Sequence, residues 1–199
     1  MANIQDNQDY YDESFNKIDI SGQNVDSAVF EKCEFINCDF SSVTFSHCKF
    51  VECVFEQCNL SLIKVINTRF ANVEFSDCKL VGIDWTAAYW PKFDFYSELI
   101  FKQSILDNCS FFGLKLHESY FEGCRLHDVD FRYVEFNKSS LLDCDFSNSL
   151  FLQTNLELTD FTESHSFNID IRQNTLSKAI FSKFEALELL KSLDIQLVD

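Results

Sequence analysis

Large apolar residues recur along this chain at every fifth position. Counting in fives from Phe15 to Phe95 meets only large apolar side chains, and a second such series runs without interruption from Leu106 to Phe161. An α-helix repeats its apolar positions about every 3.6 residues and a strand every second residue, so neither element explains this period. The pattern indicates a five-residue structural unit that is used many times.

A second position of the unit carries smaller side chains. It lies two residues before each large apolar residue, and it is mostly Cys, Ser, Thr, Val or Ala. All nine cysteines of the chain occupy it: Cys33, Cys38, Cys48, Cys53, Cys58, Cys78, Cys109, Cys124 and Cys144. The remaining three positions of each unit hold most of the charged residues.

This pattern resembles the pentapeptide-repeat family, whose consensus unit is A(D/N)LXX. The resemblance extends over residues 15–181. It implies an all-β solenoid, a right-handed quadrilateral β-helix of about eight coils, in which four units form one square coil. The large and the small residue of each unit then point inward and the other three outward. Residues twenty apart stack, which predicts a ladder of Phe15, Phe35, Phe55, Phe75 and Phe95.

The two apolar series differ by one residue in register. This difference predicts one inserted residue near residues 96–103, accommodated as a bulge or a small loop. Because the first series is unbroken as far as Phe95, it also predicts a rod without a long loop before that residue.

An unusual stretch, Trp85–Pro91, precedes the change of register. Two tryptophans occupy successive large positions, and Pro91 has no N–H group for a backbone ladder. The stretch fits either an irregular coil or a partner-contact patch made by Trp85, Tyr89 and Trp90.

The two ends of the repeat region are expected to differ. Residues 1–14 are predicted to be flexible. In residues 182–199, Ser182 and Glu185 have the spacing of a capping box for a helix over residues 183–193, followed by a short strand over residues 195–198. This segment would cap the last coil, and it either does only that or also joins two copies. The residues assigned to a dimer interface are Phe184, Leu187, Leu190, Leu193, Ile195 and Leu197.

Composition and charge narrow the class of protein. The chain has 23 Phe but only 4 Gly and 1 Pro, which argues against disorder and against a sheet built from tight hairpins. Its net charge of −16 disfavours direct binding to nucleic acid or to an anionic membrane. Neither a targeting segment nor a run of about 18 apolar residues is visible, so a cytoplasmic location is expected. In such a compartment the cysteines are expected to be free thiols.

Sequence motifs for catalysis, metal binding and cofactor binding are missing. The chain has no phosphate-binding glycine loop, no HExxH, no GxSxG and no Cys-x2-Cys, and its four histidines are scattered. We therefore expect no enzyme activity, no metal and no cofactor. Metal binding or disulfides between stacked cysteines remain alternatives to the prediction that each buried cysteine acts as a small apolar side chain.

Within the family, the chain is similar to Qnr-type and McbG-type members, on the basis of the solenoid and the ending EALELLKSLDIQLVD. This similarity implies a homodimer joined tail to tail, which binds DNA gyrase or topoisomerase IV in place of DNA and protects it from quinolones or peptide toxins. Sixteen net charges on a rod of about 40 Å approach the charge density of duplex DNA, about one per 1.7 Å. The alternative is a structural or interaction module that has no topoisomerase role.

The outward carboxylates chosen as candidate partner contacts are spread along the whole predicted rod. They are Glu34, Asp39, Glu52, Glu56, Glu74, Asp77, Asp84, Asp94, Glu122, Asp130, Glu135 and Asp145.

Overall fold

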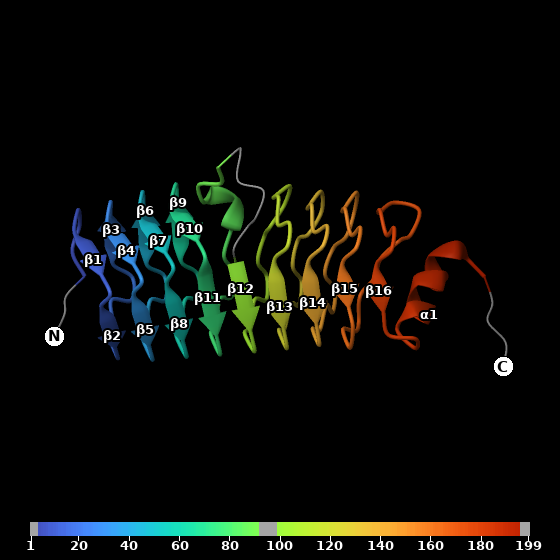
Figure 1. Cartoon of the computed structure of the whole chain (residues 1–199), viewed down its shortest axis with the longest axis horizontal. Helices are drawn as coiled ribbons and strands as arrows, with labels where there is room; N and C mark the ends of the chain where they lie inside the picture. Colours follow the sequence, from blue (N-terminus) through green and yellow to red (C-terminus); the bar gives the residue numbers. More distant parts are fainter. Residues whose placement is uncertain (1–3, 92–98, 196–199) are drawn as a thin grey trace.

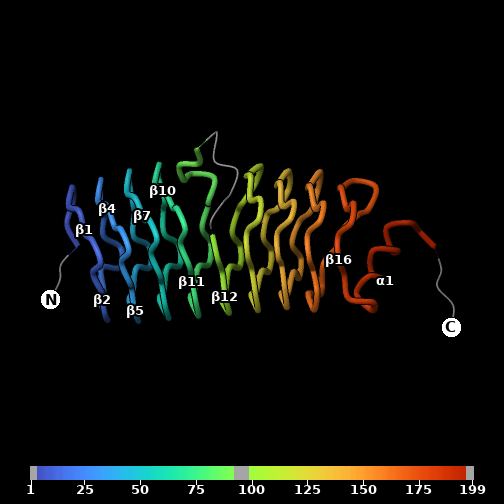
Figure 2. Tube along the Cα trace, in the orientation of Figure 1, coloured from blue at the N-terminus to red at the C-terminus, as the bar shows by residue number. Residues whose placement is uncertain are grey.

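Each five-residue unit forms one side of a square coil, and the coils stack into a rod (Figures 1 and 2). The computed structural model of the chain describes residues 4–91 and 99–195. In a typical strand such as β4 (Val29–Glu31), the middle residue Phe30 is buried and its two neighbours point outward. The predicted quadrilateral β-helix is confirmed.

One side of the rod, the long-sheet wall, is a parallel sheet that continues through the whole described solenoid (Figure 1). Its strands are β2 (Ser14–Asn16), β5 (Glu34–Ile36), β8 (Val54–Glu56), β11 (Val73–Ser76), β12 (Leu99–Lys102), β13 (Tyr120–Glu122), β14 (Ser140–Leu142), β15 (Asp160–Phe161) and β16 (Ile180–Phe181).

The other three sides are less regular. The β1–β10 wall contains β1 (Asp9–Tyr11), β4, β7 (Lys49–Val51) and β10 (Arg69–Ala71), and continues through Lys115, Glu135, Asn155 and Thr175. The β3–β9 wall contains β3 (Asn24–Asp26), β6 (Thr44–Ser46), β9 (Lys64–Ile66) and the 3-10 helix η1 (Trp85–Ala87), and continues through Ser110, Asp130 and Leu150. The bridge wall is held by isolated pairs at Asp19, Asp39, Asn59, Lys79, Ile105, Arg125, Asp145 and His165.

Stacked phenylalanines fill the first half of the core. Phe15, Phe35, Phe55 and Phe75 pair in register as predicted, and the rings of Phe35 and Phe55 lie 4.5 Å apart. Stacked and edge-to-face ring pairs each contribute about 0.5–1.5 kcal/mol beyond the burial of their apolar surface.

The corners of the coils explain how a solenoid forms with so few glycines. All four glycines have positive φ, and so do 28 other described residues, most of them at the corner two residues after a large core residue. This left-handed conformation is uncommon outside glycine. At most of these corners a hydrogen bond to the next coil compensates: for example, Asn37 N–H donates to the Glu56 carbonyl at 2.9 Å.

The change of register is larger than predicted and begins earlier. Phe75 pairs with Phe101 rather than with Phe95, a step of 26 residues where the other coils of this wall take 20. The ladder is still regular at Tyr89, whose N–H donates to the Thr68 carbonyl, so six extra residues enter between Trp90 and Leu99. The predicted single insertion near residues 96–103 is therefore wrong, because a shift of register gives the number of inserted residues only up to a multiple of five, and one and six inserted residues shift it equally. The predicted absence of a long loop before Phe95 concerns a stretch that lies partly outside the described residues, and it stays a prediction.

The first coil starts before Phe15. Tyr10 is buried in β1 and stacks on Phe30 at 5.0 Å, its hydroxyl accepts a hydrogen bond from the Gln5 N–H, and Ile4 is also buried. The prediction that residues 1–14 are flexible is wrong for the described part, residues 4–14.

The C-terminal segment differs from the expected capped helix. The helix α1 (Ala186–Leu189) is short and passes into the 3-10 helix η2 (Leu190–Leu193). The capping box is wrong: the residue before α1 is Glu185 and makes no side-chain cap, while the Ser182 hydroxyl accepts a hydrogen bond from the Glu163 N–H. The predicted strand over residues 195–198 falls almost entirely outside the described residues.

The last coil also departs from the five-residue series. Phe167 and Ile169 are buried where the series expects Ser166 and Ile171, and Ile169 pairs with Phe151. The regular register has returned at Thr175, which pairs with Asn155, and continues at Phe181, which pairs with Phe161.

Candidate interaction surface

The long-sheet wall brings together five of the predicted acidic contacts. In a strand of this wall, one side chain points outward before the buried middle residue and one after it. The corner residue that follows the strand adds a third outward side chain. The five residues are Glu34, Glu56, Glu74, Asp77 and Glu122. Asp143, Asp160 and Glu163 extend the row toward β16, whereas Lys17, Lys102 and Lys183 are the amines along it.

Two of these carboxylates have partners within the chain. The Lys102 Nζ lies 3.0 Å from Glu74 Oε1, and the Tyr120 hydroxyl donates to Glu122 Oε2 at 2.9 Å. The second bond raises the pKa of Tyr120. Of the five predicted contacts, Glu34, Glu56 and Asp77 are exposed, as are Asp143 and Glu163 further along the row, so a partner meets these carboxylates first.

The other predicted acidic residues lie on different walls. Asp39 and Asp145 belong to the bridge wall, Asp84 and Asp130 to the β3–β9 wall, and Glu52 and Glu135 to the β1–β10 wall and its corner. Asp94 lies outside the described residues. The predicted array therefore does not form one continuous face.

Four of these aspartates hold the backbone. The carboxylates of Asp39, Asp84, Asp130 and Asp145 each accept the N–H of the residue two positions on, at 2.8–3.1 Å. Hydrogen bonds from Ser41 lower the pKa of Asp39, and the Arg132 guanidinium lowers that of Asp130. These carboxylates support the turns of the coil, a local role that composition alone could not distinguish from surface charge.

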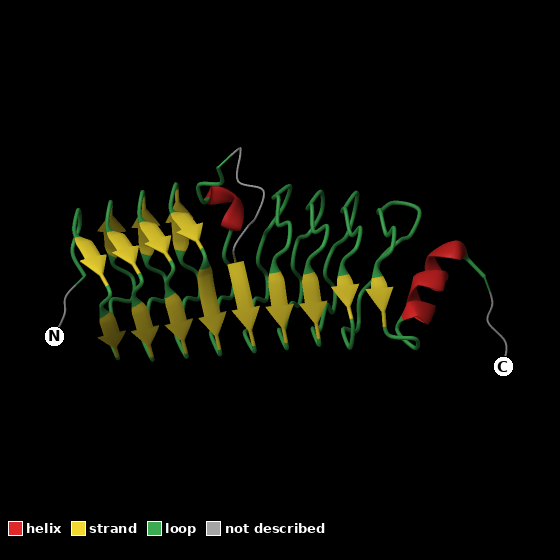
Figure 3. Cartoon of the chain, viewed as in Figure 1, coloured by secondary structure: helices red, strands yellow, loops and turns green. Residues whose placement is uncertain are grey.

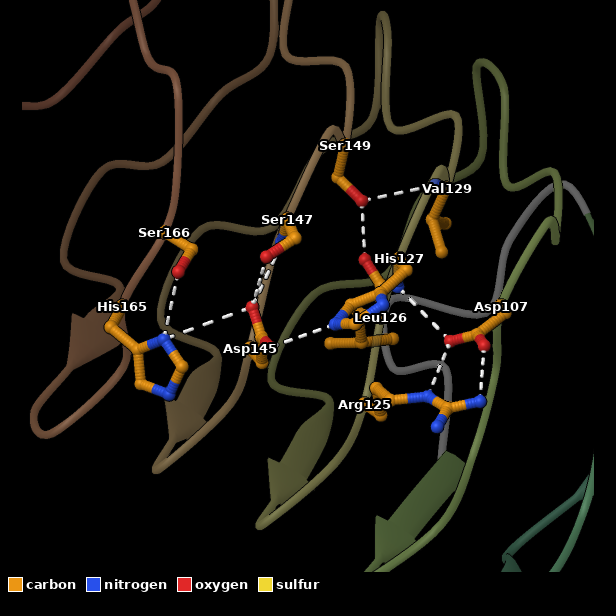
Figure 4. A network of polar contacts seen from close by, with 10 residues as sticks. All are labelled: Asp107, Arg125, Leu126, His127, Val129, Asp145, Ser147, Ser149, His165 and Ser166. Atoms are coloured by element: carbon orange, nitrogen blue, oxygen red, sulfur yellow. Dashed lines mark hydrogen bonds and ion pairs between the residues drawn. The ribbon is translucent and has the colours of Figure 1, made fainter.

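The C-terminal half of the bridge wall pairs its acidic groups with basic ones (Figure 4). Arg125 forms an ion pair with Asp107, and His127 Nε2 lies 2.7 Å from Asp145 Oδ2. Although partial burial opposes it, hydrogen bonds from Ser147 and His127 lower the pKa of Asp145 to about 2. This half of the wall is therefore a polar network and not an array of free negative charge.

The predicted contact patch at the tryptophans is largely internal. Trp85 is buried and its ring stacks on Phe111 at 5.8 Å, which excludes it from contact with a partner. Trp90 is half-buried and donates its indole N–H to the Trp85 carbonyl at 2.8 Å. Only Tyr89 of the three is well exposed, at 53%.

The C-terminal end exposes a cluster of apolar side chains. Phe184 is 79% exposed, and Leu187, Leu193 and Ile195 are also exposed, whereas Leu190 is half-buried. Leu189, which was not assigned to the interface, packs against the core instead. Leu197 lies outside the described residues.

The nine cysteines are buried free thiols. Eight of them donate to a backbone carbonyl of the preceding coil, as Cys58 does to the Phe35 carbonyl at 3.2 Å. Burial raises the pKa of Cys48 to about 11 and that of Cys53 to about 12. Among the described residues, no group of three or more His, Cys, Asp or Glu side chains is placed to hold a metal ion, and no helix is long and apolar enough to span a membrane.

The coil geometry, with two inward and three outward residues in each unit, is that of a pentapeptide-repeat solenoid. The family model described as pentapeptide repeat region matches residues 28–100, and the model described as pentapeptide repeats (8 copies) matches residues 104–143. The chain belongs to the pentapeptide-repeat family.

Solved structures similar to this chain include two of trypsin-treated variants of QnrB1, described as a plasmid-mediated fluoroquinolone resistance protein. One has a TM-score of 0.65 at 20% identity and covers 93% of this chain and 100% of that one. The other has a TM-score of 0.59 at 19% identity and covers 96% of this chain and 99% of that one. At this identity the likeness shows the fold alone. No curated protein sequence matches the chain.

Proposed function

We propose that this protein binds DNA gyrase or topoisomerase IV in place of DNA, through its long-sheet wall, and thereby protects the enzyme from quinolones or peptide toxins or modulates its activity. The observation that carries the proposal is the row of outward carboxylates on one continuous sheet. From Glu34 to Asp160 the wall advances six coils, which is about 29 Å at the usual strand spacing.

The fluoroquinolone resistance named for QnrB1 adds support by analogy, because the two rods share their fold. Carboxylates on a rigid rod would compete with phosphates for the basic groups of a DNA-binding surface. Such contacts are ionic, so binding should weaken as the salt concentration rises.

A supercoiling assay with purified gyrase tests the proposal. The intact protein is expected to change supercoiling by gyrase, or to restore supercoiling that a quinolone has blocked. The triple variant Glu34→Lys, Glu56→Lys, Glu122→Lys should lose this effect. A matched variant on the β1–β10 wall, Glu31→Lys, Glu52→Lys, Glu157→Lys, makes the same change in net charge and should retain it.

Circular dichroism melting shows whether each variant keeps the fold. Equal loss in the two triple variants would mean that net charge, rather than the long-sheet wall, governs the effect. If the unmodified protein leaves supercoiling by gyrase and by topoisomerase IV untouched with and without drug, the proposal is wrong and the chain is an interaction module of another kind.

We further propose that two copies join at their C-terminal ends, because Phe184, Leu187, Leu193 and Ile195 are exposed there together. Sedimentation equilibrium should find a dimer that Leu187→Glu converts to a monomer. Val54→Glu changes an exposed apolar residue far from this end and should leave the dimer intact. A monomeric unmodified protein would disprove this arrangement.

A further inference from the structure

The C-terminal half of the β3–β9 wall carries a group of exposed aromatic and aliphatic side chains. Phe112 and Tyr133 are each 44% exposed and their rings lie 5.2 Å apart, while Leu150 is 50% exposed. The Arg132 guanidinium lies 5.5 Å from the centre of the Phe112 ring. On an acidic rod, aromatic residues and arginine gathered in this way match the composition of protein-binding hot spots.

A groove opens beside these side chains. It has a volume of about 480 Å³ and runs between Arg132, Leu150 and Leu152 on the wall and Lys191 and Ser192 of η2. The groove can therefore receive a side chain from another molecule next to the exposed Leu150.

The charges of this surface are already paired within the chain. Arg132 binds both carboxylate oxygens of Asp130, at 2.9 and 2.7 Å, and Arg172 binds Asp170 in the same way, at 3.1 Å for each bond. Lys191 is paired with Glu188. The surface is thus locally neutral, and a neutral occupant complements it better than nucleic acid or a charged membrane.

The size of the surface limits the occupant. It covers the coils from Ser110 to Asp170, about 20 Å of rod, and each wall is about three residues, or 10 Å, wide. This area is well below the roughly 800 Å² per partner of a stable interface between folded proteins. An extended peptide of about six residues would span it.

We propose that the patch of Phe112, Arg132, Tyr133 and Leu150, with its groove, is a docking site for a short, uncharged, extended peptide segment of a partner protein. An apolar side chain of the segment enters the groove beside Leu150, and the segment packs against the two aromatic rings. The site lies on the side of the coil opposite the long-sheet wall, since two units separate them along the chain. It therefore acts independently of the acidic face.

The test uses the full-length protein and a displayed library of random twelve-residue peptides. Selected peptides should share an uncharged segment with a large apolar residue, and fluorescence anisotropy should measure their affinity as synthetic peptides. Leu150→Ser and Phe112→Ser should each weaken binding at least about tenfold, as loss of a hot-spot residue does.

Two matched variants serve as controls. Ile66→Ser removes an exposed apolar residue from the N-terminal half of the same wall, and Glu34→Gln alters the long-sheet wall. Neither should change the affinity by more than about twofold. Because all four substitutions lie at outward positions, melting temperatures should stay close to that of the unmodified protein.

Three results would overturn the proposal. One is a selection that yields no binding peptide, or only charged ones. Another is an equal loss of affinity in Ile66→Ser and Leu150→Ser, which would indicate unspecific apolar contact. The third is a dimer in sedimentation equilibrium that Leu150→Ser alone dissociates, which would make a second copy of the chain the occupant.

Discussion

The two halves of the rod build the same coil with different inward residues. Before the insertion, cysteine is the commonest residue at the small inward position and strands form on three walls; after it, serine and threonine are the commonest and strands form on the long-sheet wall (Figure 3). The thiol or hydroxyl group of this residue makes the same hydrogen bond in both halves, to a backbone carbonyl of the preceding coil. Cys53 donates to the Phe30 carbonyl at 3.4 Å, and Thr154 donates to the Phe131 carbonyl at 2.9 Å, each 23 residues back.

This comparison changes the interpretation of the small residue. Cysteine, serine and threonine share a hydrogen-bond donor on a short side chain, and the coil uses that donor to satisfy a buried carbonyl of the coil before. A small side-chain volume, which the sequence pattern suggested as the reason for the cysteines, therefore does not by itself explain why these three residue types occupy the position.

The largest expected difference between the halves concerns the aromatic core. Phe55 stacks on Phe35 at 4.5 Å and on Phe75 at 5.0 Å, whereas Phe121 stacks on Phe101 at 4.7 Å and meets Leu141 on its other side. Each substitution to alanine should lower the free energy of unfolding by about 3–5 kcal/mol, with the greater loss for Phe55→Ala. Urea titration followed by circular dichroism measures both, and a greater loss for Phe121→Ala would contradict the role given to ring stacking.

A smaller effect is expected from removing the buried hydroxyl donor. Thr154→Val keeps the shape of the side chain but removes the hydroxyl bond to the Phe131 carbonyl, which keeps only the bond from the Val134 N–H at 3.3 Å, and should cost about 0.5–1.5 kcal/mol of unfolding free energy. Thr68→Val removes the corresponding bond to the Phe45 carbonyl in the other half, at 3.0 Å, and also removes the acceptor of the Cys48 N–H, so it should cost more, about 1–3 kcal/mol. Thr162→Val at an exposed position is the control, and equal costs for all three variants would refute the donor role.

The smallest expected effect is a pH dependence in the second half. The pKa of Asp145 is lowered to about 2 from an ordinary 3.8, so its contribution to stability is complete above about pH 4 and is lost as the pH falls toward 2. Because the group is partly exposed, solvent screening should keep that contribution below about 1 kcal/mol. Melting of Asp145→Asn between pH 5 and 2 should show a weaker loss of stability with acid than the unmodified protein. A parallel loss in both proteins would assign the acid sensitivity to other carboxylates.

The five-residue period was sufficient to predict the solenoid, its inward positions and the stacking of residues such as Phe35 on Phe55. Counting one unit back from Phe15 would also have found Tyr10, which is the signal for the earlier start of the first coil. The roles of Asp39 and Asp145 could not be predicted in this way, because an aspartate that accepts a backbone N–H looks the same in sequence as one that faces solvent. The Ser182–Glu185 spacing was misleading because the preceding coil takes the serine hydroxyl as an acceptor.

The coil of 26 residues has a consequence for how such a protein can change. Phe75 and Phe101 pair as closely as residues twenty apart do elsewhere, so the six additional residues between Trp90 and Leu99 leave the stacking of both neighbours intact. A corner of a solenoid is therefore a place where a gene can gain or lose codons without disturbing the core. Loops of new length, and with them new binding specificities, can evolve at such a corner while the rod itself stays under unchanged selection.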